Sequence, residues 1–298
     1  MLAVGVVTSH NAPCVLRSAS GADAPVATWR CVVGNESALG GQAEVLRTPC
    51  ADAPAMPKQV SCACKFYHFT KFAFHHSTAE YILKVEADTI VNYRTLLAEL
   101  ARLRHVPLLW MGLFQWASHS DDGRGRYCGG GDGLHTKPPL RCVVKGARGG
   151  TTAPFASGGF DLKRRDLVRK LLHCTAYGNT TVGACDGGQG HRVARCISTE
   201  DQINMVDLTW LRFNHHPSNH TIVLHNQKHR RSVHWNSTLT PRPLPRLIGH
   251  VTSSTAAPEW SVLDWRLAPP GEDPPPSNWT LNLTRGVGRK RAGGGRPA

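Results

Sequence analysis

The stretch that decides the fold is YILKVEADTIVN, residues 81–92. Apart from Lys84, its first five residues are apolar and form a run typical of a buried strand. The run ends at Glu86-Ala87-Asp88, where two carboxylates are separated by one residue at the end of the predicted strand. Carboxylates in this arrangement can converge on one hard divalent cation, which can in turn hold a pyrophosphate. Acidic residues are also common in solvated loops after strands, so this motif alone leaves both interpretations open.

Strand and helix signals alternate on both sides of this stretch, through the first 225 residues. Apolar and β-branched runs predict strands at Leu2–Val7, 30–33, 81–85, 107–113 and 221–224. Helical spacing predicts helices at 65–76, 93–104 and 166–172, and a capping box between Thr199 and Gln202 predicts a helix over 199–206. We therefore expect an α/β fold in which a single mixed central sheet is flanked by helices.

Composition divides the chain near residue 238. Residues 226–298 contain 10 of the 20 prolines and carry 11 Lys and Arg against 4 Asp and Glu, which is half of the net charge of +14. Such a composition buries too little apolar surface to offset its ordering entropy. We predict a folded domain at 1–238 and a disordered, Pro- and Gly-rich basic tail at 239–298. A glycine-rich stretch, residues 118–153, is predicted to be a long functional loop.

Cysteine and asparagine usage indicates the secretory pathway. All ten cysteines precede the predicted tail, and their even number is compatible with a disulfide framework. Six of the eleven asparagines lie in Asn-x-Ser/Thr sequons, where chance would give about one or two. The sequons are at Asn35, Asn179, Asn219, Asn236, Asn278 and Asn282. Residues 1–7 lack the features of a signal peptide, so we expect a signal or anchor to precede them.

One group of cysteines and histidines invites a zinc interpretation. Cys62 and Cys64 are followed by His68, His75 and His76 on a predicted helix. Their spacing matches no standard zinc finger. A disulfide or a free thiol on a packed helix face is therefore favoured.

Four segments carry motifs that can be compared with known families: YILKVEADTIVN at 81–92, PFASGGF at 154–160, Glu200-Asp201-Gln202, and TIVLH at 221–225. In this order they resemble the β1,3-galactosyltransferase-like enzymes, glycosyltransferase family 31. Residues 81–92 resemble that family's YvLKtDDDvfvN segment, and PFASGGF at 154–160 resembles its glycine-rich PPYaSGgGY segment. Glu200-Asp201-Gln202 resembles its EDV motif, and TIVLH at 221–225, with Trp235 downstream, is similar to its last strand and metal-binding histidine. The resemblance spans residues 2–235 and excludes the tail.

This chain departs from the family pattern at three places. Relative to that pattern, residues 21–26 form an insertion between Arg17 and Trp29. The usual three aspartates are Glu86, Ala87 and Asp88, so one carboxylate is absent and another is a methylene longer. Phe160 occupies the position of a small residue in the glycine-rich segment. These changes are expected either to alter the donor pocket or to mark a degenerate enzyme.

The resemblance implies a GT-A fold and inverting transfer of a sugar from a UDP donor, assisted by Mn²⁺. It assigns metal binding to Asp88 and His225, and contact with the donor to Lys84, Glu86, Gly158 and Gly159. It assigns the general base to Asp201, whose carboxylate would stay ionised near the start of its predicted helix. Glu200 and His234 are secondary candidates for the site.

The implied activity is that of a type II Golgi membrane hexosyltransferase. It would transfer galactose from UDP-galactose in β1,3 linkage to a glycan acceptor, during protein or phosphoglycan glycosylation, and the basic charge would suit an anionic acceptor. One alternative is a β1,3-N-acetylglucosaminyltransferase that uses UDP-N-acetylglucosamine. Another is a non-catalytic glycosyltransferase-like binding protein, suggested by the loss of a carboxylate at Ala87. The basic tail also suggests a nucleic-acid-binding protein, but the sequons and cysteines argue against a nucleic-acid partner.

Overall fold

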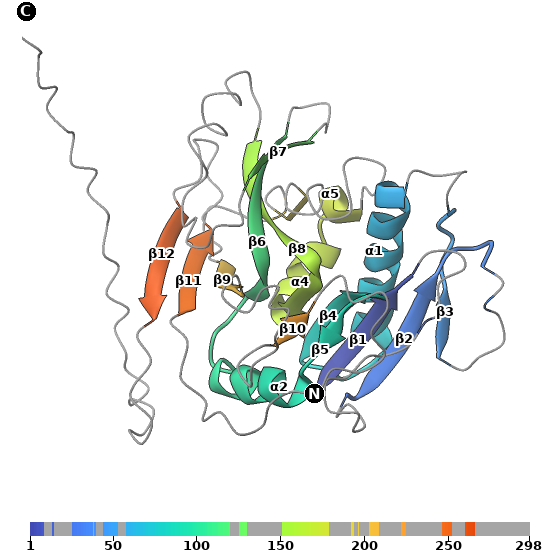
Figure 1. Ribbon diagram of the computed structural model, residues 1–298, viewed down its shortest axis with the longest axis horizontal. Helices are drawn as coiled ribbons and strands as arrows, with labels where there is room; N and C mark the ends of the chain where they lie inside the picture. Colours follow the sequence, from blue (N-terminus) through green and yellow to red (C-terminus); the bar gives the residue numbers. More distant parts are fainter. Residues whose placement is uncertain are drawn as a thin grey trace, which may run out of the picture.

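The computed structural model describes residues 1–8, 14, 26–37, 39, 44–52, 58–119, 125–129, 151–178, 192–193, 196, 203–208, 222–224, 246–251 and 260–265. The strands are β1 (Leu2–Val7), β2 (Thr28–Val33), β3 (Val45–Arg47), β4 (Tyr81–Glu86), β5 (Ile90–Val91), β6 (Leu109–His119), β7 (Gly125–Gly129), β8 (Thr151–Arg164), β9 (Ile203–Asp207), β10 (Val223–Leu224), β11 (Arg246–Val251) and β12 (Trp260–Trp265). The helices are α1 (Lys58–His76), α2 (Tyr93–Arg102), α4 (Arg165–Leu172) and α5 (Thr175–Gly178). Figure 1 shows these elements coloured along the chain.

The centre of the fold is a mixed sheet of seven strands in the order β9-β6-β8-β4-β1-β2-β3. β1 is parallel to both β2 and β4, β2 is parallel to β3, and β6 is parallel to β9. β8 is antiparallel to both of its neighbours, β4 and β6, so it runs against the other six strands. β11 and β12 extend the sheet beyond β9, β7 pairs with β6, and β10 forms a separate two-stranded sheet with β5.

Helices cover both faces of the sheet, so its central strands are buried on both sides (Figure 1). On one face, Leu2 and Val4 of β1 pack in a cluster with Leu96 of α2. On the other face, Ala3 packs in a cluster with Phe69 of α1, and α1 also contacts α4. Because side chains alternate across a strand, burial of both faces explains why β1 is apolar at every position.

The elements predicted around residues 81–92 are confirmed. β1, β2, β4 and β6 match predicted strands, and α2 and α4 match predicted helices. α1 begins at Lys58 rather than at residue 65. The α/β class with one mixed central sheet is therefore the observed architecture.

The helix predicted over 199–206 is wrong. Ile203–Asp207 forms β9, which pairs in parallel with β6. Ile203 is fully buried, and the Asn204 side-chain amide donates a hydrogen bond of 2.7 Å to the Pro107 carbonyl. Strand pairing and burial therefore override the capping pattern, which carries only local information.

The predicted loop and the predicted tail both contain strands. Within residues 118–153, β6 continues to His119, β7 occupies Gly125–Gly129 and β8 begins at Thr151. Within residues 239–298, β11 pairs antiparallel with β9 and β12. The expectation of a wholly disordered tail does not hold at these two segments, whose short apolar runs favour strands despite the composition around them.

Gly5 of β1 provides a first test of the packing, because Phe69 of α1 fills the space beside it. A Cβ atom at residue 5 would lie 2.4 Å from Phe69 Cδ1. We predict that Gly5→Ala displaces the ring and lowers the free energy of unfolding by about 1–3 kcal/mol, measured by urea denaturation. Gly178→Ala is the milder control, since its nearest contact would be Tyr67 Oη at 3.2 Å.

A double-variant cycle identifies the cause of that loss. Phe69→Leu makes room for the added methyl group, so Gly5→Ala with Phe69→Leu should lose less stability than the sum of the two single variants. Additive losses would show that the ring is not what the new methyl group meets.

Candidate functional site

The acidic residues form a turn at the carboxyl ends of two parallel strands. β4 ends at Glu86, which lies opposite Val7, the last residue of β1. The Thr89 N–H donates a hydrogen bond of 2.9 Å to the Glu86 carbonyl and closes the turn. Glu86 and Asp88 are half-buried, so a ligand can reach their carboxylates. In open α/β sheets, ligands bind at this edge of the strands.

A glycine bulge in β8 lies against this acidic turn. The pairing of β6 with β8 shifts register between Gly112 and Leu113, so residues 158–160 bulge from the ladder. Gly159 has a φ of 71°, a left-handed conformation that a residue without Cβ adopts freely. Its carbonyl accepts a hydrogen bond of 3.3 Å from Thr89 Oγ1. The structure therefore brings together two of the predicted segments, the acidic turn and the glycine-rich segment.

Lys84 is buried directly behind the turn. Its side chain is 2% exposed, and its Nζ donates a hydrogen bond of 3.2 Å to Glu86 Oε1. Residues two apart on a strand share a face, so this ion pair lies on the α1 side of the sheet. Phe160, which departs from the family pattern, packs on the other side, in the core cluster that contains Val85.

The two predicted histidines, His225 and His234, lie outside the described residues. The strand that leads to His225 is described: Leu224 of β10 lies opposite Ile90 of β5. The Asn92 N–H also donates a hydrogen bond of 2.8 Å to the carbonyl of residue 222. β10 therefore pairs with the short strand that follows the acidic turn.

The assignment of Asp201 as general base relied on a predicted helix over 199–206, but Ile203–Asp207 is a strand. Glu200 and Asp201 lie outside the described residues, and the chain after them is β9, so the helix-dipole argument for an ionised Asp201 no longer applies. At the carboxyl end of β9, Asp207 lies opposite Gly112 of β6, at the same edge of the sheet as the acidic turn. Asp207 was missed because the helix prediction concealed its position at a strand end.

A buried ion pair also escaped prediction. Lys163 Nζ lies 2.6 Å from Asp161 Oδ1, and both side chains are 1% exposed. The Trp110 indole N–H donates to the same oxygen at 2.8 Å. The rings of Trp110 and Phe66 flank the ammonium, with their centroids at 4.8 and 5.0 Å. The signal in the sequence was the alternation of apolar and charged residues along 160–163, which puts both charges on one face of β8.

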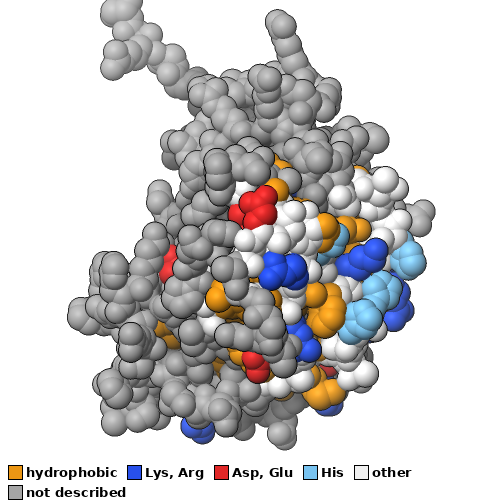
Figure 2. Space-filling model, turned by 90° about the vertical axis from the view of Figure 1, so that its right-hand side faces the viewer, with side chains coloured by type: hydrophobic (Ala, Val, Ile, Leu, Met, Phe, Trp, Pro, Cys, Tyr) orange, Lys and Arg blue, Asp and Glu red, His pale blue; other side chains and the backbone are white. Residues whose placement is uncertain are grey.

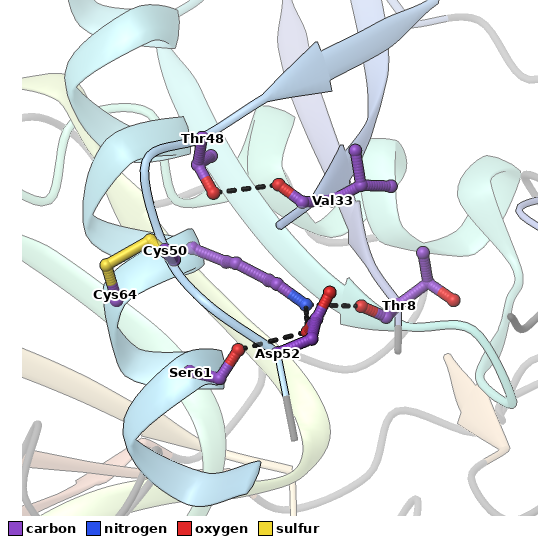
Figure 3. Close-up of a disulfide and its surroundings, with 8 residues drawn as sticks. Thr8, Val33, Thr48, Cys50, Asp52, Ser61 and Cys64 are labelled. Carbon is purple, nitrogen blue, oxygen red and sulfur yellow. Dashed lines mark hydrogen bonds and ion pairs between the residues drawn. A yellow bond between two sulfur atoms is a disulfide. The ribbon is translucent and has the colours of Figure 1, made fainter. Parts of the chain in front are cut away.

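A second buried ion pair supports the end of β1 (Figure 3). Lys65 of α1 pairs with Asp52, and its Nζ also donates a hydrogen bond of 2.9 Å to the Thr8 carbonyl. Ser61 Oγ donates to Asp52 Oδ1 at 3.2 Å. α1 is thereby fixed to the carboxyl end of β1, beside the acidic turn.

The disulfide interpretation is confirmed for Cys64, which is bonded to Cys50 (Figure 3). The ligand atoms of Cys50, Cys64 and His68 lie within 4.8 Å of one another, but the disulfide engages both sulfurs. Burial, with a contribution from the Lys71 charge, lowers the pKa of His68. Cys62 is also disulfide-bonded, so neither cysteine of the proposed zinc group offers a thiolate.

The other two histidines of that group lie on the surface. His75 and His76 are exposed at the end of α1, near Lys71. The His75 ring meets the Phe74 ring edge-on, with centroids 5.3 Å apart, and the His76 ring lies tilted against the Phe72 ring, with centroids 5.0 Å apart. Figure 2 shows histidine and basic side chains side by side on this face. Within the described parts of the chain, neither histidine belongs to a group of three potential metal ligands.

Further disulfides and one exposed sequon bear on the expectation that the protein passes through the secretory pathway. Cys14 is bonded to Cys31, and Cys174 to Cys196. Asn35 is exposed in the turn after β2, whereas the other five sequons lie outside the described residues. No helix in the described ranges is long and apolar enough to span a membrane.

Comparison with known proteins leaves the family open. No family model matches the chain, and no curated protein matches it significantly. A functional assignment therefore depends on the four motifs and on the geometry of the described residues.

The left-handed Gly159 gives a prediction about the bulge. Gly159→Ala places a Cβ in a disfavoured conformation and should lower the free energy of unfolding by about 1–2 kcal/mol in urea denaturation. Gly159→Asn should lose less, because asparagine tolerates this conformation better than alanine. Equal losses for the two variants would contradict a conformational cause.

The buried lysine predicts how stability depends on pH. The pKa of Lys163 is lowered from 10.5 to about 8, chiefly because burial disfavours the charged ammonium; the Asp161 carboxylate opposes this shift, and the Lys84 and Arg192 charges contribute to it. Between these two pKa values the unfolded chain binds more protons than the folded chain, so the free energy of unfolding should rise with pH. The rise should reach about 3 kcal/mol at most.

The matched variant is Asp161→Asn/Lys163→Met, which lacks both charges. The free energy of unfolding of the wild type minus that of this variant should increase from about pH 8 to about pH 10.5, measured by urea denaturation at each pH. A difference that stays constant over this window would contradict the lowered pKa.

Proposed function

We propose that this chain is a metal-dependent glycosyltransferase with a GT-A fold that transfers a hexose from a UDP-sugar to a glycan acceptor, with inversion. The observation that carries the proposal is the half-buried Glu86–Asp88 turn at the carboxyl edge of β1 and β4, held against the Gly159 bulge. The mixed α/β sheet is compatible with this fold. The four motifs, in order, support the family.

The acidic turn suits a divalent cation. Asp88 and Glu86 offer carboxylate oxygens, which are hard ligands, from a half-buried turn of fixed shape. Asp88 and His225 would hold the cation, and Glu86 would contact its shell or the ribose; an imidazole ligand fits Mn²⁺ better than Mg²⁺. When bound, the cation neutralises negative charge on the UDP leaving group.

The chain's own residues then bind and orient the donor. The buried Lys84 ammonium holds the half-buried Glu86 carboxylate through an ion pair. The bulge at Gly158 and Gly159 presents backbone without Cβ atoms, which lets a ligand approach closely. The hydrogen bond from Thr89 Oγ1 to the Gly159 carbonyl joins the acidic turn to the bulge, the two sides of the proposed donor site.

The general base would take a proton from the acceptor hydroxyl, which attacks the anomeric carbon from the face opposite to UDP. Asp201 is the candidate that the family motif supplies. Asp207 is a second candidate, favoured by its position at the carboxyl end of β9. The two candidates predict different variants to lose activity. If Asp201 is the base, Asp201→Asn should lose turnover and Asp207→Asn should not; if Asp207 is the base, the reverse is expected.

The donor sugar and the acceptor follow from the resemblance. UDP-galactose in β1,3 linkage is proposed, with UDP-N-acetylglucosamine as the alternative donor. The acceptor is a glycan, and the excess of basic residues suits an anionic one such as a phosphoglycan. The disulfides among the described cysteines and the exposed Asn35 sequon support a lumenal location in the Golgi.

A non-catalytic glycan-binding protein remains the second candidate. Its specific support is Ala87, which stands where the family has the middle aspartate. A protein of this kind would bind the acceptor glycan without turning over a UDP-sugar.

Transfer assays with Mn²⁺ and a panel of UDP-sugars test the proposal. We expect the wild type to transfer galactose, and Asp88→Ala to lose at least about a hundredfold in rate, because the cation loses a direct ligand. Asp201→Asn and Asp207→Asn identify the base, with a similar loss expected in one of them only. A fully active Asp88→Ala variant, or a wild type inactive with every donor, would contradict the assignment.

A further inference from the structure

Three buried charged side chains lie on the α1 side of the sheet, directly behind the acidic turn. The Lys84 side chain is 2% exposed, and those of Asp161 and Lys163 are each 1% exposed. Asp161 of β8 is paired across the ladder with Lys84 of β4. Opposed residues of this kind have Cβ atoms about 5 Å apart and share a face, so the Asp161 carboxylate is within reach of two lysines.

Only one of these lysines bonds Asp161 in the structure. Lys163 Nζ and the Trp110 indole N–H both donate to Asp161 Oδ1. Asp161 Oδ2 is buried and has no hydrogen-bond partner. The Lys84 ammonium instead bonds Glu86 Oε1 at 3.2 Å.

Stability alone is a poor reason for this arrangement. Burying an ion pair costs desolvation energy that the attraction often only balances, and apolar replacements are frequently as stable. A buried oxygen without a partner adds to that cost. The arrangement does, however, decide whether the Lys84 ammonium pairs with Glu86 or with Asp161.

β8 contacts the acidic turn at a second point as well. The Gly159 carbonyl, two residues before Asp161, accepts the hydrogen bond from Thr89 Oγ1. Two connections therefore link β8 to the acidic turn. One is the hydrogen bond from Thr89 to the Gly159 carbonyl, and the other is Asp161, which lies opposite the lysine that bonds Glu86.

We propose that Lys163 is a positioning residue: by occupying Asp161, it leaves Lys84 to hold the Glu86 carboxylate in the geometry that binds the metal and the diphosphate. This inference rests on the proposed function for its ligand. Without Lys163, Asp161 becomes an uncompensated buried carboxylate opposite Lys84. The Lys84 ammonium then turns toward Asp161, and Glu86 is released.

The test compares a single variant with its double variant. Calorimetric titration with UDP in the presence of MnCl₂ should show Lys163→Met binding about tenfold more weakly than the wild type. Asp161→Asn/Lys163→Met should recover most of the affinity, because the competing carboxylate is gone. A single variant that binds like the wild type, or a double variant as weak as the single one, would overturn the proposal.

A merely structural role predicts a different pattern. It would lower the melting temperature of Lys163→Met but leave the affinity of the folded fraction unchanged. Lys163→Gln serves if Lys163→Met does not fold, since the amide still donates to Asp161 but lacks the charge; it should weaken binding in the same direction. Glu80→Gln is the matched control, because it breaks the 3.4 Å ion pair with Arg164 at the other edge of the sheet and should leave affinity unchanged.

Amide exchange tests the positioning without any ligand. The Thr89 N–H, bonded to the Glu86 carbonyl at 2.9 Å, should exchange several-fold faster in Lys163→Met and return toward the wild-type rate in the double variant. The Leu103 N–H, bonded to the Glu99 carbonyl at the end of α2, should be unaffected. This pattern in a protein that binds no UDP would contradict the proposed function while leaving the positioning role intact. Unchanged exchange at Thr89 would overturn the positioning role itself.

Discussion

The parallel pairing of β1 with β4 is the constraint on which the rest of the structure depends. Both strands are buried between α1 and α2, so their register cannot slip without exposing an apolar face. Because they run in the same direction, their last residues, Val7 and Glu86, meet at one edge. The acidic turn, its contact with β8 and the support from α1 are all arranged around that edge.

Three lysines buried on the α1 side of the sheet bring charge to this edge, and each has a carboxylate partner. The pairs are Lys65 with Asp52, Lys84 with Glu86, and Lys163 with Asp161. Buried ion pairs add little to stability on balance, but they are directional and fix the groups that they join. In this fold they join α1 to Asp52 in the segment after β3, Lys84 of β4 to the acidic turn, and two positions along β8. The Lys65 ammonium also reaches the end of β1 through its hydrogen bond to the Thr8 carbonyl.

Residues 81–92 predict their strand correctly because a strand buried on both faces is apolar along its length, a pattern visible in the sequence itself. The bulge at Gly159 and the pairing of Asp161 with Lys163 depend on which strands lie next to β8, and the sequence order does not reveal this. Residues 199–206 carry a helix signal, but β6 offers residues 204–207 a partner strand, and Ile203 is fully buried. Because a helix was predicted there, the position of Asp207 at the carboxyl end of a strand was not recognised. Composition averaged over the last quarter of the chain concealed the short apolar runs of β11 and β12.

The central claim is that the Glu86–Asp88 turn holds a divalent cation together with the diphosphate of a nucleotide. Anomalous X-ray diffraction from crystals grown with MnCl₂ and UDP tests it most directly. The account predicts a manganese peak at coordination distance from the Asp88 carboxylate, with the diphosphate beside the Gly159 bulge. Nucleotide bound elsewhere, or density for UDP at this edge with no metal at Asp88, would contradict it.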